Sequence, residues 1–574
     1  MSKQFKKLLS VHIGIALFFT VYQAKSQDLN TARNLTGAEQ FEAAAKIFKS
    51  LIVKEPNNGT YYYYYGENFL KAYFADTLSN SIKEETDAAL VFYKKGLEVD
   101  PNNPLNNVGK GKVALYNGDA KTAKTEFDDA QNKFPSKTNK TSKLSKDDQA
   151  ITLMCIAEAY INAPKKKDIN LALLFLDKAI ALDPKNPEIY LIKGDAYMEN
   201  NDGTNAITNY KKAEELDPKS PKAKLRIGQL RFRTKSYQDA QTYYKDALLI
   251  DSTYAPAYLE LGVTFAKAGQ NEVAKKYYKK YLELSNNVSA KVKYGLVLYD
   301  LKDYSEAIEQ FNEVMAIDSS RNDLNRALAY CYFEDKKYDK ALYYITKFFK
   351  NTKPEKTINL DYVYYARILA KSKMDSLAVT QFKIAYERDS TNTDMLSEMA
   401  TSLAKMKKYN DAADALNKKI AIMKDKAEPN DYYSLGKNYY NNLSQLEKSD
   451  TSLYYKMLLK ADTAFSTVLS LQSGHINALL LKATTRSMID DYKNPKLMVG
   501  LAKPYFELYI QKTQQDSVKY VKDRITAYNY LGYYYLIYKD YCNSIACWER
   551  IVAVDPKNEK ALGALKDLKG KCNK

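Results

Sequence analysis

Histidine is almost absent from this chain of 574 residues, which has only two, His12 and His475. So few imidazoles argue against histidine-based catalysis and against histidine metal sites. Proline (15) and glycine (20) are also scarce for the length, so a long turn-rich β architecture is not expected. The sequence shows no glycine-rich phosphate loop, paired acid–base site or nucleophile elbow. We therefore predict that the protein is not an enzyme and has no catalytic, cofactor-binding or metal-binding residues.

Cysteine is also rare, and the five cysteines are Cys155, Cys331, Cys542, Cys547 and Cys572. Their spacing matches no metal site. Cys542 and Cys547 lie five apart on one predicted helix, where a rise of about 1.5 Å per residue separates them too far for an easy bridge. Cys542 with Cys572 is the one pair that we consider. Buried single thiols are the favoured interpretation.

Long apolar runs are missing except near the N-terminus, where 17 uncharged residues extend from Leu8 to Ala24 behind three lysines. This run is shorter than the ~20 residues that span a bilayer. Small residues at Ala24 and Ser26 suit cleavage after Ser26, so residues 1–26 are predicted to be an export signal. We expect an exported protein, most simply a periplasmic one. The alternative is an uncleaved signal that tethers the chain to the inner membrane.

The chain carries a formal net charge of +18, and removing the predicted signal, with its four lysines and no acid, leaves +14. Such a charge attracts acidic partners or membrane surfaces. The charges are dispersed, and the densest basic runs, Lys165–Lys167 and Lys275–Lys280, are predicted to lie in a loop and on a helix face. Together with the export signal, this argues against nucleic acid as a partner. Association with the envelope or a membrane surface is left open.

What the sequence has in abundance is an internal repeat. A small residue returns fourteen times, with six spacings of 34 residues, one of 33, and longer ones of 37 to 49 that indicate insertions. A bulky apolar residue follows each small one by four positions, so the two share one helix face. The small residue allows two helices to approach closely. The fourteen positions are Ala44, Ala89, Ala123, Ala172, Ala206, Ala240, Ala274, Ala307, Ala341, Ala378, Ala412, Ala461, Ala502 and Ser544.

Glycine and aspartate mark the two helices of each repeat. Gly194, Gly228 and Gly262 fall inside predicted helices, where glycine costs ~1 kcal/mol relative to alanine, so close helix contact is expected there. Asp217-Pro218 ends a second helix because proline cannot continue it. Each repeat is therefore predicted to be a pair of helices.

This pattern resembles the tetratricopeptide repeat, whose signature is aromatic–Leu–Gly–aromatic followed by Ala, aromatic, Ala and Pro over 34 residues. The best matches are Tyr258, Leu261, Gly262, Phe265, Ala274 and Tyr278, and near the end Tyr528, Leu531, Gly532, Tyr535 and Trp548. The resemblance implies an all-α solenoid of about fourteen helix-turn-helix units. It also implies a right-handed superhelix whose concave groove is lined by the first helix of each pair.

The domain prediction follows from the repeat boundaries. Residues 27–556 form the solenoid, regular to about residue 427 and irregular with insertions beyond it. Residues 557–574 form a capping helix and tail, because Asn558–Leu568 is amphipathic. The polar insertions at 76–85 and 136–147 are expected to be surface loops.

In this family, certain positions of the first helix face inward. Transferred to this chain, these positions predict which residues line the groove. Arginine and lysine interleaved with aromatics suit extended or acidic protein segments. The alternative for each tyrosine is packing against a neighbouring repeat. The candidate groove residues are Leu191, Asp195, Phe232, Arg233, Arg326, Tyr330, Phe333, Arg367, Tyr433, Lys437, Tyr440, Asn529 and Tyr533.

Two functional hypotheses follow. The first is a protein–protein interaction scaffold of the bacterial cell envelope that binds partner segments in the groove. The second is a glycan- or lipid-binding accessory factor of envelope biogenesis, suggested by the tyrosine-rich lining and the positive charge.

Overall fold

The computed structural model describes residues 28–78, 81–137, 139–446, 451–490, 498–516 and 518–572. The predicted export signal lies outside these residues. Within them every regular element is a helix, which confirms the all-α prediction. None of the described helices is both long and apolar enough to cross a membrane. The chain divides into two compact units, Met1–Cys331 and Tyr332–Lys574, which we call unit 1 and unit 2.

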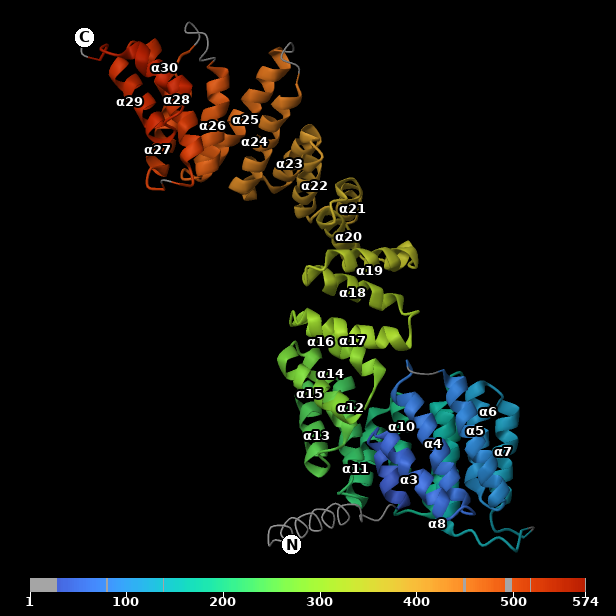
Figure 1. Cartoon of the computed structure of the whole chain (residues 1–574). Coiled ribbons are helices and arrows are strands. Elements are labelled where there is room, and N and C mark those ends of the chain that lie inside the picture. Colours follow the sequence, from blue (N-terminus) through green and yellow to red (C-terminus); the bar gives the residue numbers. More distant parts are fainter. Residues whose placement is uncertain are drawn as a thin grey trace, which may run out of the picture. The chain divides into compact units, whose positions relative to one another are not determined.

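Unit 1 consists of consecutive helix pairs (Figure 1). The helices are α2 (Leu29–Gly37), α3 (Phe41–Lys54), α4 (Gly59–Ala75), α5 (Ile82–Val99), α6 (Pro104–Asn117), α7 (Ala120–Asn132), α8 (Lys146–Asn162), α9 (Ile169–Leu182), α10 (Pro187–Glu199), α11 (Gly203–Leu216), α12 (Pro221–Arg233), α13 (Tyr237–Ile250), α14 (Ala255–Lys267), α15 (Asn271–Leu284), α16 (Val288–Asp300) and α17 (Tyr304–Ile317). Helix α18 (Asn322–Glu334) contains the division between the units.

Unit 2 continues the pairing to the last helix. Its α-helices are α19 (Tyr338–Lys350), α20 (Asn359–Lys371), α21 (Asp375–Arg388), α22 (Asp394–Lys405), α23 (Tyr409–Met423), α24 (Pro429–Asn442), α25 (Thr451–Leu471), α26 (Ile476–Ile489), α27 (Lys503–Thr513), α28 (Val521–Ile537), α29 (Tyr541–Val554) and α30 (Glu559–Leu568). Three short 3-10 helices are η1 (Pro354–Lys356), η2 (Lys424–Lys426) and η3 (Leu443–Gln445).

The small repeat positions form the seams between helices. All fourteen predicted positions are 0% exposed, from Ala44 in α3 to Ser544 in α29. The bulky residues four positions later are buried as well, including Phe48, Tyr244 and Trp548. Ala502 differs from the others because it caps α27 instead of lying inside it. The periodic pattern thus identified the core of the array.

The mid-helix glycines of the first helices explain this packing. A Cβ on Gly228 would lie 2.5 Å from the Tyr244 ring, and one on Gly532 would lie 2.7 Å from Trp548. The aromatic ring of the second helix therefore rests directly on the glycine of the first. Glycine's cost in a helix is offset by burial of a whole ring.

Unit 2 ends in a cap that is fastened covalently. Helix α30 buries Ala561 and Leu568 against Trp548. Cys542 and Cys572 form a disulfide with a Cα–Cα distance of 4.8 Å. The preference for single thiols was wrong for this pair, because the turn after α30 brings the tail back to α29. Cys155 and Cys547 are buried as free thiols, and Cys331 is buried as well.

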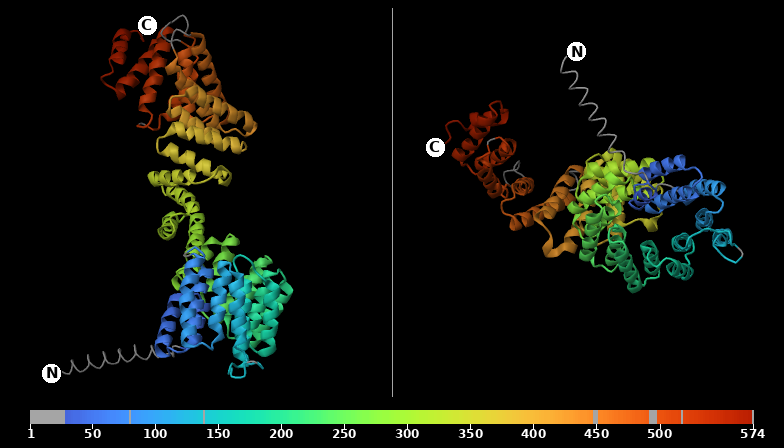
Figure 2. Two further views of the ribbon diagram at one scale, coloured as in Figure 1. Left: turned by 90° about the vertical axis from the view of Figure 1, so that its right-hand side faces the viewer. Right: turned by 90° about the horizontal axis from the view of Figure 1, so that it is seen from below.

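Unit 1 closes on itself into a ring, visible in the right-hand view of Figure 2. The Asp76 carboxylate, just after α4, accepts hydrogen bonds from the backbone N–H groups of Val288 (2.5 Å) and Ser289 (3.2 Å) at the start of α16. Gln40 donates to the Thr253 carbonyl at 2.9 Å. Asp76 is therefore buried, and the prediction of a surface loop beginning at this residue was wrong. A carboxylate at a helix N-terminus is favourable because the free N–H groups there need acceptors.

Candidate functional site: a charged cavity inside unit 1

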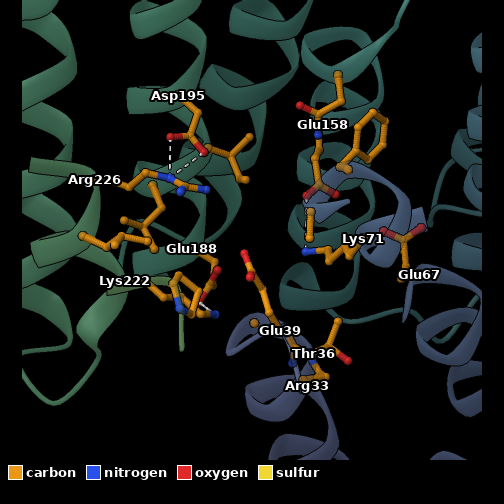
Figure 3. Close-up of a pocket in the computed structure, with 18 of the residues that line it drawn as sticks. Arg33, Thr36, Glu39, Glu67, Lys71, Glu158, Glu188, Asp195, Lys222 and Arg226 are labelled. Carbon is orange, nitrogen blue, oxygen red and sulfur yellow. Dashed lines mark hydrogen bonds and ion pairs between the residues drawn. The ribbon is translucent and has the colours of Figure 1, made fainter. Parts of the chain in front are cut away.

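The ring of unit 1 encloses a cavity of about 420 Å³. Side chains from α2, α4, α8, α10, α12 and α14 line it, which are mainly the first helices of successive pairs (Figure 3). This volume lies within the range of small-molecule sites. The labelled lining residues in Figure 3 are Arg33, Thr36, Glu39, Glu67, Lys71, Glu158, Glu188, Asp195, Lys222 and Arg226.

One wall is a buried charge cluster centred on Lys112 of α6, which is 1% exposed. Its ammonium group donates to Glu67 (2.6 Å) and Glu158 (2.7 Å), and Lys71 lies 3.5 Å from Glu158. Tyr93 completes the cluster by donating to Glu67 at 2.8 Å. Burial alone would raise the pKa of Glu158, but Lys112 and Lys71 hold it below its ordinary value. These groups satisfy one another and lock three first helices together.

The facing wall consists of ion pairs between α10 and α12. Lys222 donates to Glu188 at 2.6 Å, and Arg226 Nε lies 2.9 Å from Asp195 Oδ1. Tyr210 also donates to Asp195, at 2.8 Å. Burial raises the pKa of Asp195 in spite of the arginine. The neighbouring carboxylate and burial act in opposite directions on Arg226, and its pKa is raised, so it stays charged.

Two further carboxylates at the ring closure have no such cation. Among the described residues, neither Glu39 nor Glu260 has a lysine or arginine at ion-pair distance. Glu39 accepts from the Tyr281 hydroxyl (2.6 Å), and Glu260 accepts from the Gln229 amide (2.7 Å). Burial raises the pKa of Glu39 to about 7 and also raises that of Glu260.

The comparisons with known proteins identify the repeat. A family model described as "TPR repeat" matches residues 194–235, and one described as "Tetratricopeptide repeat" matches residues 259–322. The C-terminal part of a TPR repeat-containing protein from Cytophaga hutchinsonii is 32% identical, with 99% of that chain and 48% of this one covered. This chain belongs to the tetratricopeptide repeat family.

Among the solved structures that the chain resembles, three each match a part of it. The TM-score to the Cytophaga hutchinsonii protein is 0.40. YrrB, described as a TPR protein with an unusual peptide-binding site, is 24% identical, covers 30% of this chain and 91% of its own, and has a TM-score of 0.28. PilF of Pseudomonas aeruginosa is 16% identical over 39% of this chain and 99% of its own, with a TM-score of 0.34. No curated protein matches the sequence.

Of the predicted tetratricopeptide groove residues in unit 1, the cavity brings together Leu191 and Asp195. Phe232 instead packs against Tyr237, with ring centroids 5.4 Å apart. Arg233 donates to the Met198 carbonyl on the preceding first helix, at 3.3 Å.

The candidates on α18 lie on both sides of the division between the units. Tyr330 is buried, with its ring centroid 6.5 Å from that of Tyr299, whereas Arg326 is half-buried. Phe333 packs edge-on against Tyr364, 5.5 Å away. The aromatic candidates of α18 therefore contact neighbouring helices.

The remaining candidates in unit 2 are spread over three further first helices. Arg367 of α20 pairs with Glu398 of α22 through contacts of 2.6 to 3.0 Å, so it links two repeats. Asn529 donates within α28 to the Ile525 carbonyl at 3.0 Å. Tyr533 lies edge-on to Trp548 at 5.1 Å, with Lys560 of the cap over its ring.

The three candidates on α24 differ from these because they share one helix face at positions i, i+4 and i+7. Lys437 is exposed, and Tyr433 and Tyr440 are half-buried on either side of it. Tyr433 also packs against the ring of His475, 4.8 Å away.

Sequence reasoning missed the cavity residues Glu39, Lys71, Arg226 and Glu260. A repeat signal would require a spacing of 34 residues, and Arg226 stands only 31 residues after its partner Asp195. Glu39 carried no such signal either, because it reaches the cavity only through the closure of the ring.

Proposed function

We propose that this protein is a non-enzymatic scaffold of the bacterial cell envelope, exported by its N-terminal signal, that holds partner proteins on the concave side of its repeats. Tetratricopeptide repeats support protein–protein interaction in general. The exported location and the groove are the parts that we add. The observation that carries the proposal is the array of helix pairs, in which a first helix, α24, leaves Lys437 exposed between two half-buried tyrosines.

Within that array, α24 is the surface best suited to an incoming segment. The exposed ammonium of Lys437 lies between two half-buried tyrosines, Tyr433 and Tyr440, on a single face. A cation flanked by aromatic rings matches an extended segment that carries acidic and apolar side chains. By contrast, Arg367 and Asp195 already have ion-pair partners within the chain, so they offer less to a partner.

The export part is supported by the disulfide between Cys542 and Cys572. Structural disulfides persist mainly in oxidising compartments such as the periplasm. Cell fractionation of the full-length protein, with and without residues 1–26, tests this part. Recovery of the full-length protein in the cytoplasm with both cysteines reduced would contradict it.

Site-specific photo-crosslinking tests the binding surface. A photoreactive amino acid at position 437 or 440 is expected to capture a protein in living cells. The matched control is position 455 on α25, the second helix of that repeat, where Tyr455 is 49% exposed. Equal capture at 455, or none at 437 and 440, would overturn the assignment of the groove.

A further inference from the structure

The cavity of unit 1 is acidic, although the chain as a whole is strongly basic. Its lining contains six carboxylates and four cationic side chains, and Lys112 behind the wall adds a fifth cation. Net charge over the whole chain is +18. The excess of carboxylates over cationic side chains is therefore local to this cavity.

The excess is concentrated at the ring closure. The cations of the walls are committed to Glu67, Glu158, Glu188 and Asp195 through contacts of 2.6 to 3.5 Å. Arg33 lies 4.5 Å over the Tyr64 ring. Glu39 and Glu260 remain. Among the described residues they accept hydrogen bonds from neutral donors, and Lys293 and Arg226 attract Glu260 only from further away.

The groups that face Glu39 come from every surrounding element. Tyr281 of α15 donates to it, Glu260 of α14 and Asp76 after α4 repel its charge, and Arg226 of α12 attracts it from further away. Tyr254, which precedes α14, also lines the cavity. The carboxyl group thus faces two like charges in a partly open cavity, where a second cation would be favoured.

Apolar side chains complete the lining beside these carboxylates. Leu225, Leu259 and the ring of Tyr254 border the same cavity. They offer a surface for a short aliphatic chain. The space therefore combines an acidic end with an apolar wall.

We propose that this cavity binds a small aliphatic amine in its protonated form, with the ammonium group between Glu39 and Glu260 and the alkyl chain against Leu225 and Leu259. The ammonium group supplies a cation at ion-pair distance, which neither carboxylate has among the described residues. The amine belongs to a free small molecule or to the end of a short peptide, and both present the same chemistry. This inference concerns a site separate from α24 and does not rest on the scaffold role.

Isothermal titration calorimetry of the full-length protein tests the proposal. The probes are 1,4-diaminobutane and 1,5-diaminopentane, with 1,4-butanediol and succinate as uncharged and anionic controls. A free-amine tripeptide and its N-acetylated form distinguish a peptide end from a free amine. We expect binding by at least one free-amine probe and none by the diol, succinate or the acetylated peptide.

Glu39→Gln and Glu260→Gln are each expected to weaken amine binding at least tenfold. Glu42→Gln is the matched control, because Glu42 is exposed three residues away on α3 and should leave binding unchanged. Circular dichroism verifies that each variant is folded. Unchanged affinity in both cavity variants, or equal binding of diol and diamine, would overturn the proposal.

Release of the Glu39 proton on amine binding can be measured, and a purely structural role of Glu39 would not produce it. Since the pKa of Glu39 is near 7 without ligand, a bound cation should displace its proton at neutral pH. The binding enthalpy should then depend on the ionisation enthalpy of the buffer in the parent protein but much less in Glu39→Gln. The absence of any buffer dependence in the parent protein would count against the proposal, as would a failure of all amines to bind at millimolar concentration.

Discussion

Unit 1 joins its first repeats to helices 212 residues further along the chain through Asp76 and Asn287, whereas unit 2 ends in a covalently fastened cap. Both arrangements cover an apolar face that would otherwise be exposed at the end of the stack. A repeat buries its apolar face only against a neighbour, so the last one in a stack is left uncovered. Ring closure adds a second consequence that a cap does not have, because it encloses a cavity.

The difference between the two units shows that the same kind of repeat can build a closed ring or a capped stack. In unit 1 the inner side chains form ion pairs across a closed space, and some carboxylates are left without a cation. In unit 2 an exposed lysine remains on α24. The two units can be separated experimentally, because Trp548, the only tryptophan in the chain, reports on the end of unit 2.

The largest effect is expected from Lys112→Met. It would leave Glu67 and Glu158 buried without their main cation, and breaking a buried pair in this way costs about 3–5 kcal/mol. Denaturant unfolding followed by circular dichroism should show the loss, while Trp548 fluorescence should keep its midpoint. Lys405→Met is the control, because its pair with Asp375 is half exposed and should contribute less than about 1 kcal/mol. Equal losses in the two variants would contradict this picture.

The disulfide should affect only unit 2. Replacing Cys542 and Cys572 by serine is expected to destabilise the cap by about 2–4 kcal/mol, the usual contribution of such a cross-link. Trp548 fluorescence during unfolding measures it. Adding reductant to the double variant should change nothing further. A shift confined to the part of the transition that Trp548 does not report would contradict the assignment.

Replacing glycine by alanine should lower the stability in the array and raise it in the cap. Gly228→Ala forces a Cβ to within 2.5 Å of the Tyr244 ring, so a loss of about 1–3 kcal/mol is expected. Gly563→Ala in α30 meets nothing within 4 Å and should stabilise the helix by up to about 1 kcal/mol. Gly262→Ala should fall between them, since its Cβ would lie 3.2 Å from Tyr278. Thermal unfolding ranks the three, and a gain for Gly228→Ala would refute the packing argument.

The smallest expected effect is a pH dependence confined to unit 1. The folded ring raises the pKa of Glu39 from 4.5 to about 7, so the folded state binds this proton more tightly than the unfolded state. The resulting stabilisation is complete below about pH 4.5 and is lost as the pH rises through 7. Its size is on the order of 1 kcal/mol after allowance for the partial exposure of this side chain. Glu39→Gln should flatten this part of the stability profile between pH 5 and 8, and an unchanged slope would exclude Glu39 as its source.

The sequence predicted the parts of the fold that depend on near neighbours. The small positions from Ala44 to Ser544 are all buried, and Gly228 lies under Tyr244, because such contacts follow from spacing within one repeat. Ring closure could not be predicted in this way. It depends on curvature summed over many repeats, so Asp76 looked like the start of an insertion. Leu191 and Asp195 line the cavity of unit 1, but whether they contact a partner stays a prediction.

The hydrogen bonds of Asp76 also restrict how this protein can change in evolution. Arrays of this kind commonly gain or lose whole modules by duplication or deletion. Insertion of one 34-residue repeat between Asp76 and Ser289 would separate the Asp76 carboxylate from the Ser289 groups that donate to it. The number of repeats between these two residues is therefore fixed. Added repeats between Ser289 and the cap would leave the ring closure and the cap intact, so we expect related proteins to differ in length in unit 2.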